Sequence, residues 1–105
     1  MSMQAIALTD IQTAEVCIIL RAVFTHAPVK TWVFGSRATG RARLYSDLDI
    51  LVSTPTPLDW RVRADLQDAF EASNLPFRVD VVEESRLAPT LAPRVLSERQ
   101  ILLFD

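Results

Sequence analysis

Three aspartates stand in or beside runs of strand-forming residues. Asp47 and Asp49 flank Leu48 at the start of an apolar run, and Asp80 stands between valines in a later run. Because side chains alternate along a strand, Asp47 and Asp49 share one face, with roughly 7 Å between their positions. Two carboxylates this close raise each other's pKa unless a cation lies between them. Oxygen-only ligands suit Mg²⁺ or Mn²⁺, so we predict a metal site here.

Asp80 extends this acidic pattern to the next strand-forming run. In that run Phe77, Val79 and Val81 alternate with Arg78, Asp80 and Val82. A carboxylate buried beside valines is costly unless it is paired or bound to a metal. If the two strands are neighbours, the three carboxylates converge on one patch. A surface position of Asp80, or a salt bridge to Arg78 or Arg86, is the open alternative.

A Gly-Ser dipeptide follows the strand-forming run that precedes the aspartate pair. Gly35 lets the backbone approach a phosphate closely, and a helix beginning there offers free N–H groups. Ser36 adds a hydroxyl donor. The segment 16–46 carries five Lys or Arg residues and no Asp or Glu. A basic segment that leads into paired carboxylates is typical of a site for a polyphosphate with bound metal.

Together these features resemble a known signature. Gly35-Ser36, ten intervening residues and then Asp47-x-Asp49 resemble the motif of the nucleotidyltransferase superfamily related to DNA polymerase β. The stretch GSRATGRARLYSDLDILV, residues 35–52, most closely resembles the minimal nucleotidyltransferase (MNT) family. The resemblance covers nearly the full chain and includes Asp80. It implies an α+β fold with a polymerase β-like core, in which helices flank a small mixed sheet.

The resemblance also implies roles for the aspartates. Asp47 and Asp49 would bind two divalent ions, Mg²⁺ or alternatively Mn²⁺. Asp80 would be a further metal ligand or the general base. The reaction would be in-line attack on the α-phosphate of a nucleoside triphosphate, with release of pyrophosphate.

For the nucleotide, the resemblance implies that Gly35 and Ser36 hold the triphosphate and that Arg37 is an auxiliary phosphate contact. ATP is the expected donor. MNT proteins are often encoded beside a small helical HEPN-type partner, and this implies an antitoxin that transfers AMP to its toxin. Two alternatives stay open: a two-subunit transferase for a small molecule, and a non-catalytic binding module.

The elements that must position these residues follow from periodicity. We predict helices over 9–26 and 58–73, with Thr9 and Gln12 as a capping box at the first. Strands are predicted over 30–34, 48–52 and 77–82, and a turn with a helical start over 36–46. Residues 94–99 are expected to form a short helix, and 100–104 a helix end or strand. Alternating strands and helices around one small sheet indicate an α/β or α+β unit.

Length and charge limit the function further. The 105 residues predict one domain over 1–105, and a second domain for the acceptor would not fit, so we expect a partner chain and an oligomer. A net charge of −2 argues against direct nucleic-acid binding. The sequence has no apolar run long enough to span a bilayer and no signal-peptide pattern, so no membrane association is expected. A cytoplasmic protein is predicted.

Overall fold

The computed structural model describes residues 5–25 and 27–102. Its helices are α1 (Asp10–Val23), α2 (Ser36–Thr39), α3 (Trp60–Glu71) and α4 (Ala92–Glu98), with a 3₁₀ turn η1 (Glu84–Arg86). Its strands are β1 (Lys30–Phe34), β2 (Leu48–Ser53), β3 (Val79–Glu83) and β4 (Gln100–Ile101).

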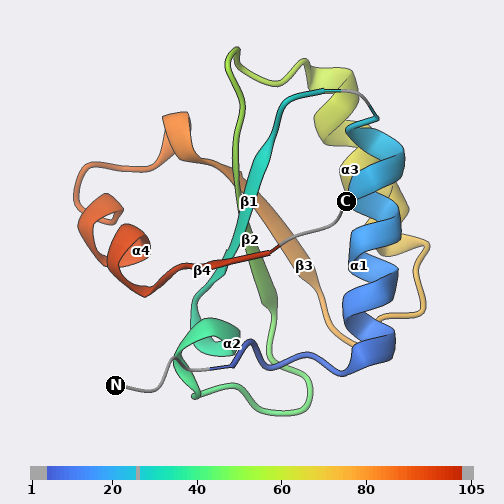
Figure 1. Ribbon diagram of the computed structural model, residues 1–105, viewed down its shortest axis with the longest axis vertical. Helices are drawn as coiled ribbons and strands as arrows, with labels where there is room; N and C mark the ends of the chain where they lie inside the picture. The colour runs from blue at the N-terminus through green and yellow to red at the C-terminus, as the bar shows by residue number, and fades with distance from the viewer. Residues whose placement is uncertain (1–4, 26, 103–105) are drawn as a thin grey trace.

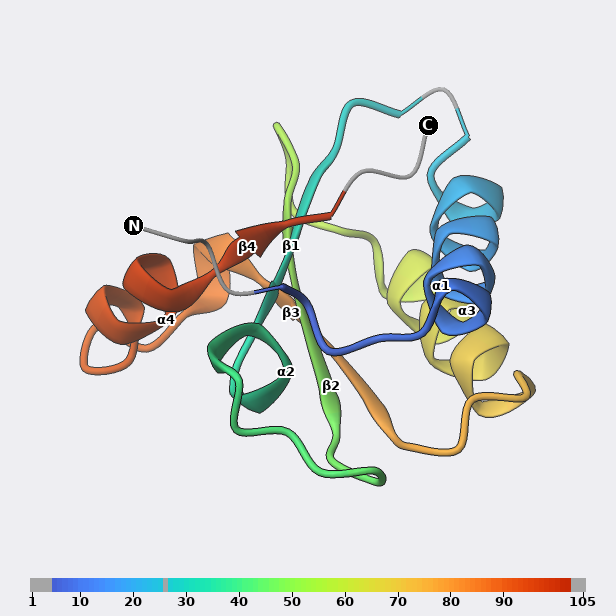
Figure 2. The same ribbon diagram turned by 60° about the horizontal axis from the view of Figure 1, so that its bottom comes forward.

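The strands form a mixed sheet in the order β3-β2-β1-β4. β1 pairs antiparallel with both β2 and β4, whereas β2 and β3 are parallel. Helices α1 and α3 lie side by side against one face of the sheet (Figure 1). Helices α2 and α4 lie on the other side (Figure 2). The parallel pair is therefore flanked by helices, as parallel strands usually are.

The core lies between the sheet and the α1–α3 layer. Alternate residues of β2 point into it, and Leu48, Ile50 and Val52 are at most 1% exposed. Leu20 of α1 and Leu66 of α3 pack against the same cluster. The opposite face of β2 is consequently the one that presents Asp49.

Local signals set the helix ends. Thr9 caps α1 by accepting a hydrogen bond from the Gln12 amide at 3.1 Å, and the Gln12 side chain accepts from the Thr9 amide at 3.0 Å. The predicted capping box is therefore confirmed. Asp59 is the N-cap of α3, and its side chain accepts from the Arg61 amide at 3.1 Å. The helix predicted over 58–73 therefore begins later, at Trp60, because the chain turns into helix only after this cap, and it also ends earlier, at Glu71 with Ala72 as its C-cap.

The α+β expectation, a small mixed sheet flanked by helices, is confirmed. Each predicted strand is present, although β3 begins at Val79 rather than at residue 77. The segment after α4 forms strand β4, which settles the alternative left open for it. The helix predicted over 9–26 ends earlier than expected, at Val23, because Phe24 is its C-cap and the chain turns there. His26 and residues 103–105 lie outside the described residues, so the predicted end at 104 is not tested. None of the helices in the described part of the chain is both long and apolar enough to cross a membrane.

Candidate active site

The strand pairing brings the candidate active-site residues together. In the parallel β2–β3 pair Asp49 lies directly opposite Asp80. In the antiparallel β1–β2 pair Phe34 lies opposite Asp49. The chain leaves β1 at Phe34 and enters α2 through Gly35, so this turn adjoins the Asp49 carboxylate. Register alone therefore places the Gly-Ser turn, Asp49 and Asp80 together.

Gly35 is in direct contact with Asp49. Its φ is +76°, a backbone conformation that side chains disfavour. A Cβ atom at this position would lie 2.3 Å from Oδ2 of Asp49. The absence of a side chain at residue 35 is therefore what allows the carboxylate to lie against the turn.

Replacing Gly35 with Ala is expected to move the Asp49 carboxylate and strain the turn. The φ strain costs about 1–3 kcal/mol of unfolding free energy, measured by urea denaturation. Binding of an ATP analogue with Mg²⁺, measured by calorimetry, should be lost as well. Gly40→Ala is the matched control, because Gly40 also has a positive φ (+78°) but is exposed at the end of α2. Equal nucleotide binding by the two variants would contradict the contact between residue 35 and Asp49.

Asp49 is half-buried among other acidic groups. Burial, followed by the negative charges of Asp80, Asp47 and Glu98, raises the pKa of Asp49 from 3.8 to about 6. Arg78 opposes this shift only in part. An ionised Asp49 is therefore unfavourable in the protein by itself, and a bound cation would relieve the repulsion.

This shift predicts a pH-dependent stability difference between the wild type and Asp49→Asn. When the pKa of a carboxyl group is higher in the folded than in the unfolded state, the free energy of unfolding falls as the pH rises between the two values. For Asp49 this fall runs from about pH 4 to about pH 6. The Asn variant lacks this loss. Since solvent screens a half-exposed group, we expect the variant to be more stable by about 1–2 kcal/mol at pH 7 in chelator. If the unfolding free energies of the two proteins change in parallel from pH 4 to pH 7, the raised pKa of Asp49 is contradicted.

The other two predicted aspartates differ in exposure. Asp47 is exposed in the loop just before β2. Asp80 is half-buried, and its Oδ1 accepts from Nη2 of Arg78 at 3.1 Å and from Nε at 3.3 Å. The salt bridge to Arg78 that the sequence left as an alternative is thus present. Asp80 keeps its place opposite Asp49 at the same time.

The acidic groups around Asp49 are all carboxylates. Carboxylate oxygens are ligands that suit a hard divalent cation. However, no group of three or more His, Cys, Asp or Glu side chains within residues 5–25 and 27–102 is placed to hold a metal. Mg²⁺ is commonly held by one or two carboxylates and completed by substrate phosphates. The arrangement matches that kind of site, rather than a closed three-carboxylate cage.

Arg37 has a different set of contacts from the one expected. The side chain is only 5% exposed. Its guanidinium donates to the backbone carbonyls of Ala7 (2.6 Å), Ser46 (3.0 Å) and Leu44 (3.1 Å), and its centre lies 4.0 Å from the Phe77 ring centroid. Burial lowers the pKa of Arg37. These contacts occupy the guanidinium and give Arg37 a structural role, and a phosphate contact stays an untested expectation.

The loop that Arg37 holds leads directly to Asp47. Both Leu44 and Ser46 accept from the guanidinium, and the Ser46 hydroxyl accepts from the Arg43 amide at 2.8 Å. The loop is consequently anchored at several backbone positions. Arg37 thereby positions the aspartate pair through the backbone of this loop.

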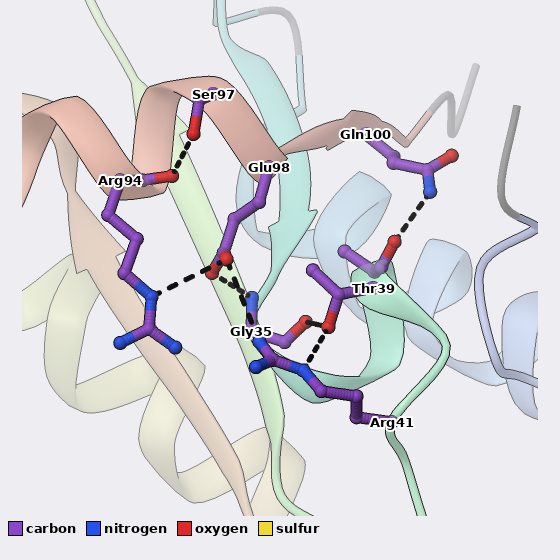
Figure 3. Close-up of polar contacts among 8 residues, drawn as sticks. Gly35, Thr39, Arg41, Arg94, Ser97, Glu98 and Gln100 are labelled. Atoms are coloured by element: carbon purple, nitrogen blue, oxygen red, sulfur yellow. Dashed lines mark hydrogen bonds and ion pairs between the residues drawn. The ribbon is translucent and has the colours of Figure 1, made fainter.

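Sequence reasoning missed one residue of the site, Glu98. Its Oε1 accepts from the Gly35 amide at 3.0 Å, although 63 residues separate the two (Figure 3). The acidic charge of Glu98 also contributes to the pKa shift of Asp49. No local motif marks Glu98, because the contact depends on where α4 ends relative to β1.

Comparisons with known proteins identify the family of this chain. The family model for polymerase beta nucleotidyltransferases matches residues 19–105. MntA of Haemophilus influenzae, described as a probable protein adenylyltransferase, is 40% identical over 82 residues, which cover 77% of this chain and 72% of that protein. The chain belongs to the minimal nucleotidyltransferase family. It is therefore a nucleotidyltransferase.

Solved structures of other MNT-type proteins support the same assignment. One assigned as a minimal nucleotidyltransferase is 38% identical, with a TM-score of 0.67, and the match covers 90% of this chain and 97% of that one. A toxin–antitoxin structure with AMP-PNP is 26% identical, with a TM-score of 0.70, over 89% of this chain and 73% of that one. The polymerase β-like core expected from the sequence is thus confirmed.

Proposed function

We propose that this MNT chain is a metal-dependent adenylyltransferase that transfers AMP from ATP to a hydroxyl group on a small helical partner of the HEPN type. In this role it would be the cytoplasmic antitoxin of a toxin–antitoxin pair, with residues 1–105 as a single catalytic domain. The observation that carries the proposal is the contact of the Gly35 turn with Asp49, opposite Asp80. The name of MntA and the AMP-PNP complex of a related toxin–antitoxin pair support the acceptor and the donor.

In the proposed site Asp47 and Asp49 would hold Mg²⁺, with Mn²⁺ as the alternative and two ions expected. The bound metal would neutralise the triphosphate and polarise the α-phosphate. The half-buried position of Asp49 and the surrounding negative charge suit such a ligand, because they favour any cation that lies against the carboxylate.

The remaining site residues would bind and orient the reactants. The turn of Gly35 and Ser36 would lie along the triphosphate, since backbone at a glycine can approach phosphate closely. A hydroxyl oxygen of the acceptor forms a bond to the α-phosphorus as the bond to the pyrophosphate oxygen breaks. Asp80 would accept the hydroxyl proton, held in place by Arg78 at 3.1 Å. No covalent intermediate on the enzyme is required.

The test is a transfer assay with ATP labelled in the α-phosphate, Mg²⁺ and the partner protein encoded beside this chain. Label on the partner is the expected result. Label on a small molecule supplied from cell extract would instead indicate the two-subunit transferase. A variant carrying Asp47→Asn and Asp49→Asn that still neutralised the partner fully would show that binding alone suffices.

A further inference from the structure

Glu98, the last residue of α4, places a carboxylate in the proposed triphosphate site. The side chain is 13% exposed, and its Oε1 accepts from the Gly35 amide at 3.0 Å. Its Oε2 lies 3.6 Å from Nε of Arg94 and 3.9 Å from Nη2 of Arg41. Figure 3 shows the two guanidinium groups and the Gly35 amide gathered around this one carboxylate.

The shape of the turn does not depend on Glu98. The Gly35 carbonyl accepts from the Ala38 amide at 3.0 Å and from the Thr39 hydroxyl at 3.1 Å. Gln100 of β4 donates to the Ala38 carbonyl at 2.7 Å, which ties the turn to the sheet. The bond from the Gly35 amide to Glu98 can therefore be exchanged for another acceptor without loss of the turn.

The partners of Glu98 are the groups that bind phosphate in proteins. A backbone N–H at a glycine and two arginines would serve a phosphate oxygen as well as they serve a carboxylate oxygen. The arginines are also available to a ligand, because their side chains are 60% (Arg41) and 66% (Arg94) exposed. Glu98, in contrast, lies close enough to Asp49 for the two negative charges to repel.

We propose that Glu98 is an internal anion that occupies the position of the terminal phosphates and is displaced when the triphosphate binds. This inference rests on the proposed function. On binding, the Gly35 amide and the two arginines exchange the carboxylate for phosphate oxygens. A nucleoside monophosphate lacks the terminal phosphates and leaves Glu98 in place, whereas a triphosphate has to displace the carboxylate.

The experiment measures calorimetric binding of inorganic tripolyphosphate and of AMP, each with Mg²⁺, to the wild type and to Glu98→Gln. The glutamine keeps an oxygen that can accept from the Gly35 amide but loses the charge. We expect the variant to bind tripolyphosphate about 5-fold more tightly, as for loss of one like charge nearby, and AMP with unchanged affinity. Asp65→Asn, an equal charge change on the exposed surface of α3, should match the wild type.

Unchanged or weaker tripolyphosphate binding by Glu98→Gln would overturn the proposal, because it would give Glu98 a purely structural role. Arg94→Ala is a second variant that should fold, since Arg94 is exposed. We expect it to bind tripolyphosphate about 5-fold more weakly than Arg61→Ala, and equal affinity would also overturn the proposal.

If the wild type transfers AMP but Glu98→Gln binds tripolyphosphate no more tightly, only this inference fails. If none of the proteins binds tripolyphosphate or transfers AMP, the proposed function fails with it.

Discussion

Replacing Asp49 with Asn is expected to abolish AMP transfer, with a loss of at least about 10³-fold in rate. Asp49 is the carboxylate against which the Gly35 turn lies and the one opposite Asp80. The substitution removes its charge with little change of shape. Loss of a metal ligand removes several kcal/mol of transition-state stabilisation, and each 1.36 kcal/mol is a factor of ten in rate. Initial rates of label transfer from ATP to the partner measure the effect.

The same variant carries its own control for folding. Because Asp49→Asn is expected to be more stable than the wild type at pH 7, unfolding cannot explain an inactive protein. Asp65→Asn, which changes one exposed charge on α3, should keep full activity. Retention of a tenth or more of the wild-type rate by Asp49→Asn would show that this carboxylate is not a metal ligand.

Replacing Arg37 with Met is expected to destabilise the fold by about 3–5 kcal/mol. The substitution keeps the apolar stem but removes a buried guanidinium, which leaves the carbonyls of Ala7, Leu44 and Ser46 without their donor. A buried acceptor left unsatisfied costs about 1–3 kcal/mol, and because these three hydrogen bonds are only partly buried we take each near the low end of that range. Since small domains have only about 5–15 kcal/mol of stability, the variant should unfold at much lower urea concentration.

Arg61→Met is the matched control for this substitution. Arg61 is an exposed arginine on α3 that lies 5.5 Å from the Trp60 ring, and its loss should change the unfolding free energy by less than about 1 kcal/mol. Equal urea midpoints for the two variants would contradict the structural role of Arg37. A stable Arg37→Met protein with weakened tripolyphosphate binding would instead restore the phosphate contact expected from the sequence.

Local patterns predicted much of this fold because their physical causes act over a few residues. The capping box at Thr9 joins groups three residues apart. The alternation through Leu48, Asp49 and Ile50 fixes which side chains enter the core once one face is covered. The placement of the aspartates on the opposite face followed from the same alternation. Parallel pairing of β2 with β3 then put Asp49 beside Asp80.

Contacts between distant segments could not be predicted in this way. Arg37 donates to a carbonyl 30 residues earlier in the chain, and Gly35 donates to a carboxylate 63 residues later. Both depend on how the N-terminal segment and α4 lie across the sheet. The family resemblance implied a phosphate contact for Arg37, which stays untested, and burial and backbone acceptors give Arg37 a structural role that no local pattern marks. No sequence pattern marked Glu98 as a site residue, since a single glutamate at a helix end is common.

The most direct test of the central claim compares ATP labelled in the α-phosphate with ATP labelled in the γ-phosphate, under identical conditions with Mg²⁺ and the partner protein. Nucleotidyl transfer predicts that the partner acquires the α-label, while the γ-label is released as pyrophosphate. If the partner acquires the γ-label instead, the reaction is phosphoryl transfer. If the partner acquires neither label, the chain acts on it by binding alone. Either of these results would contradict the account of the site built on Gly35, Asp49 and Asp80.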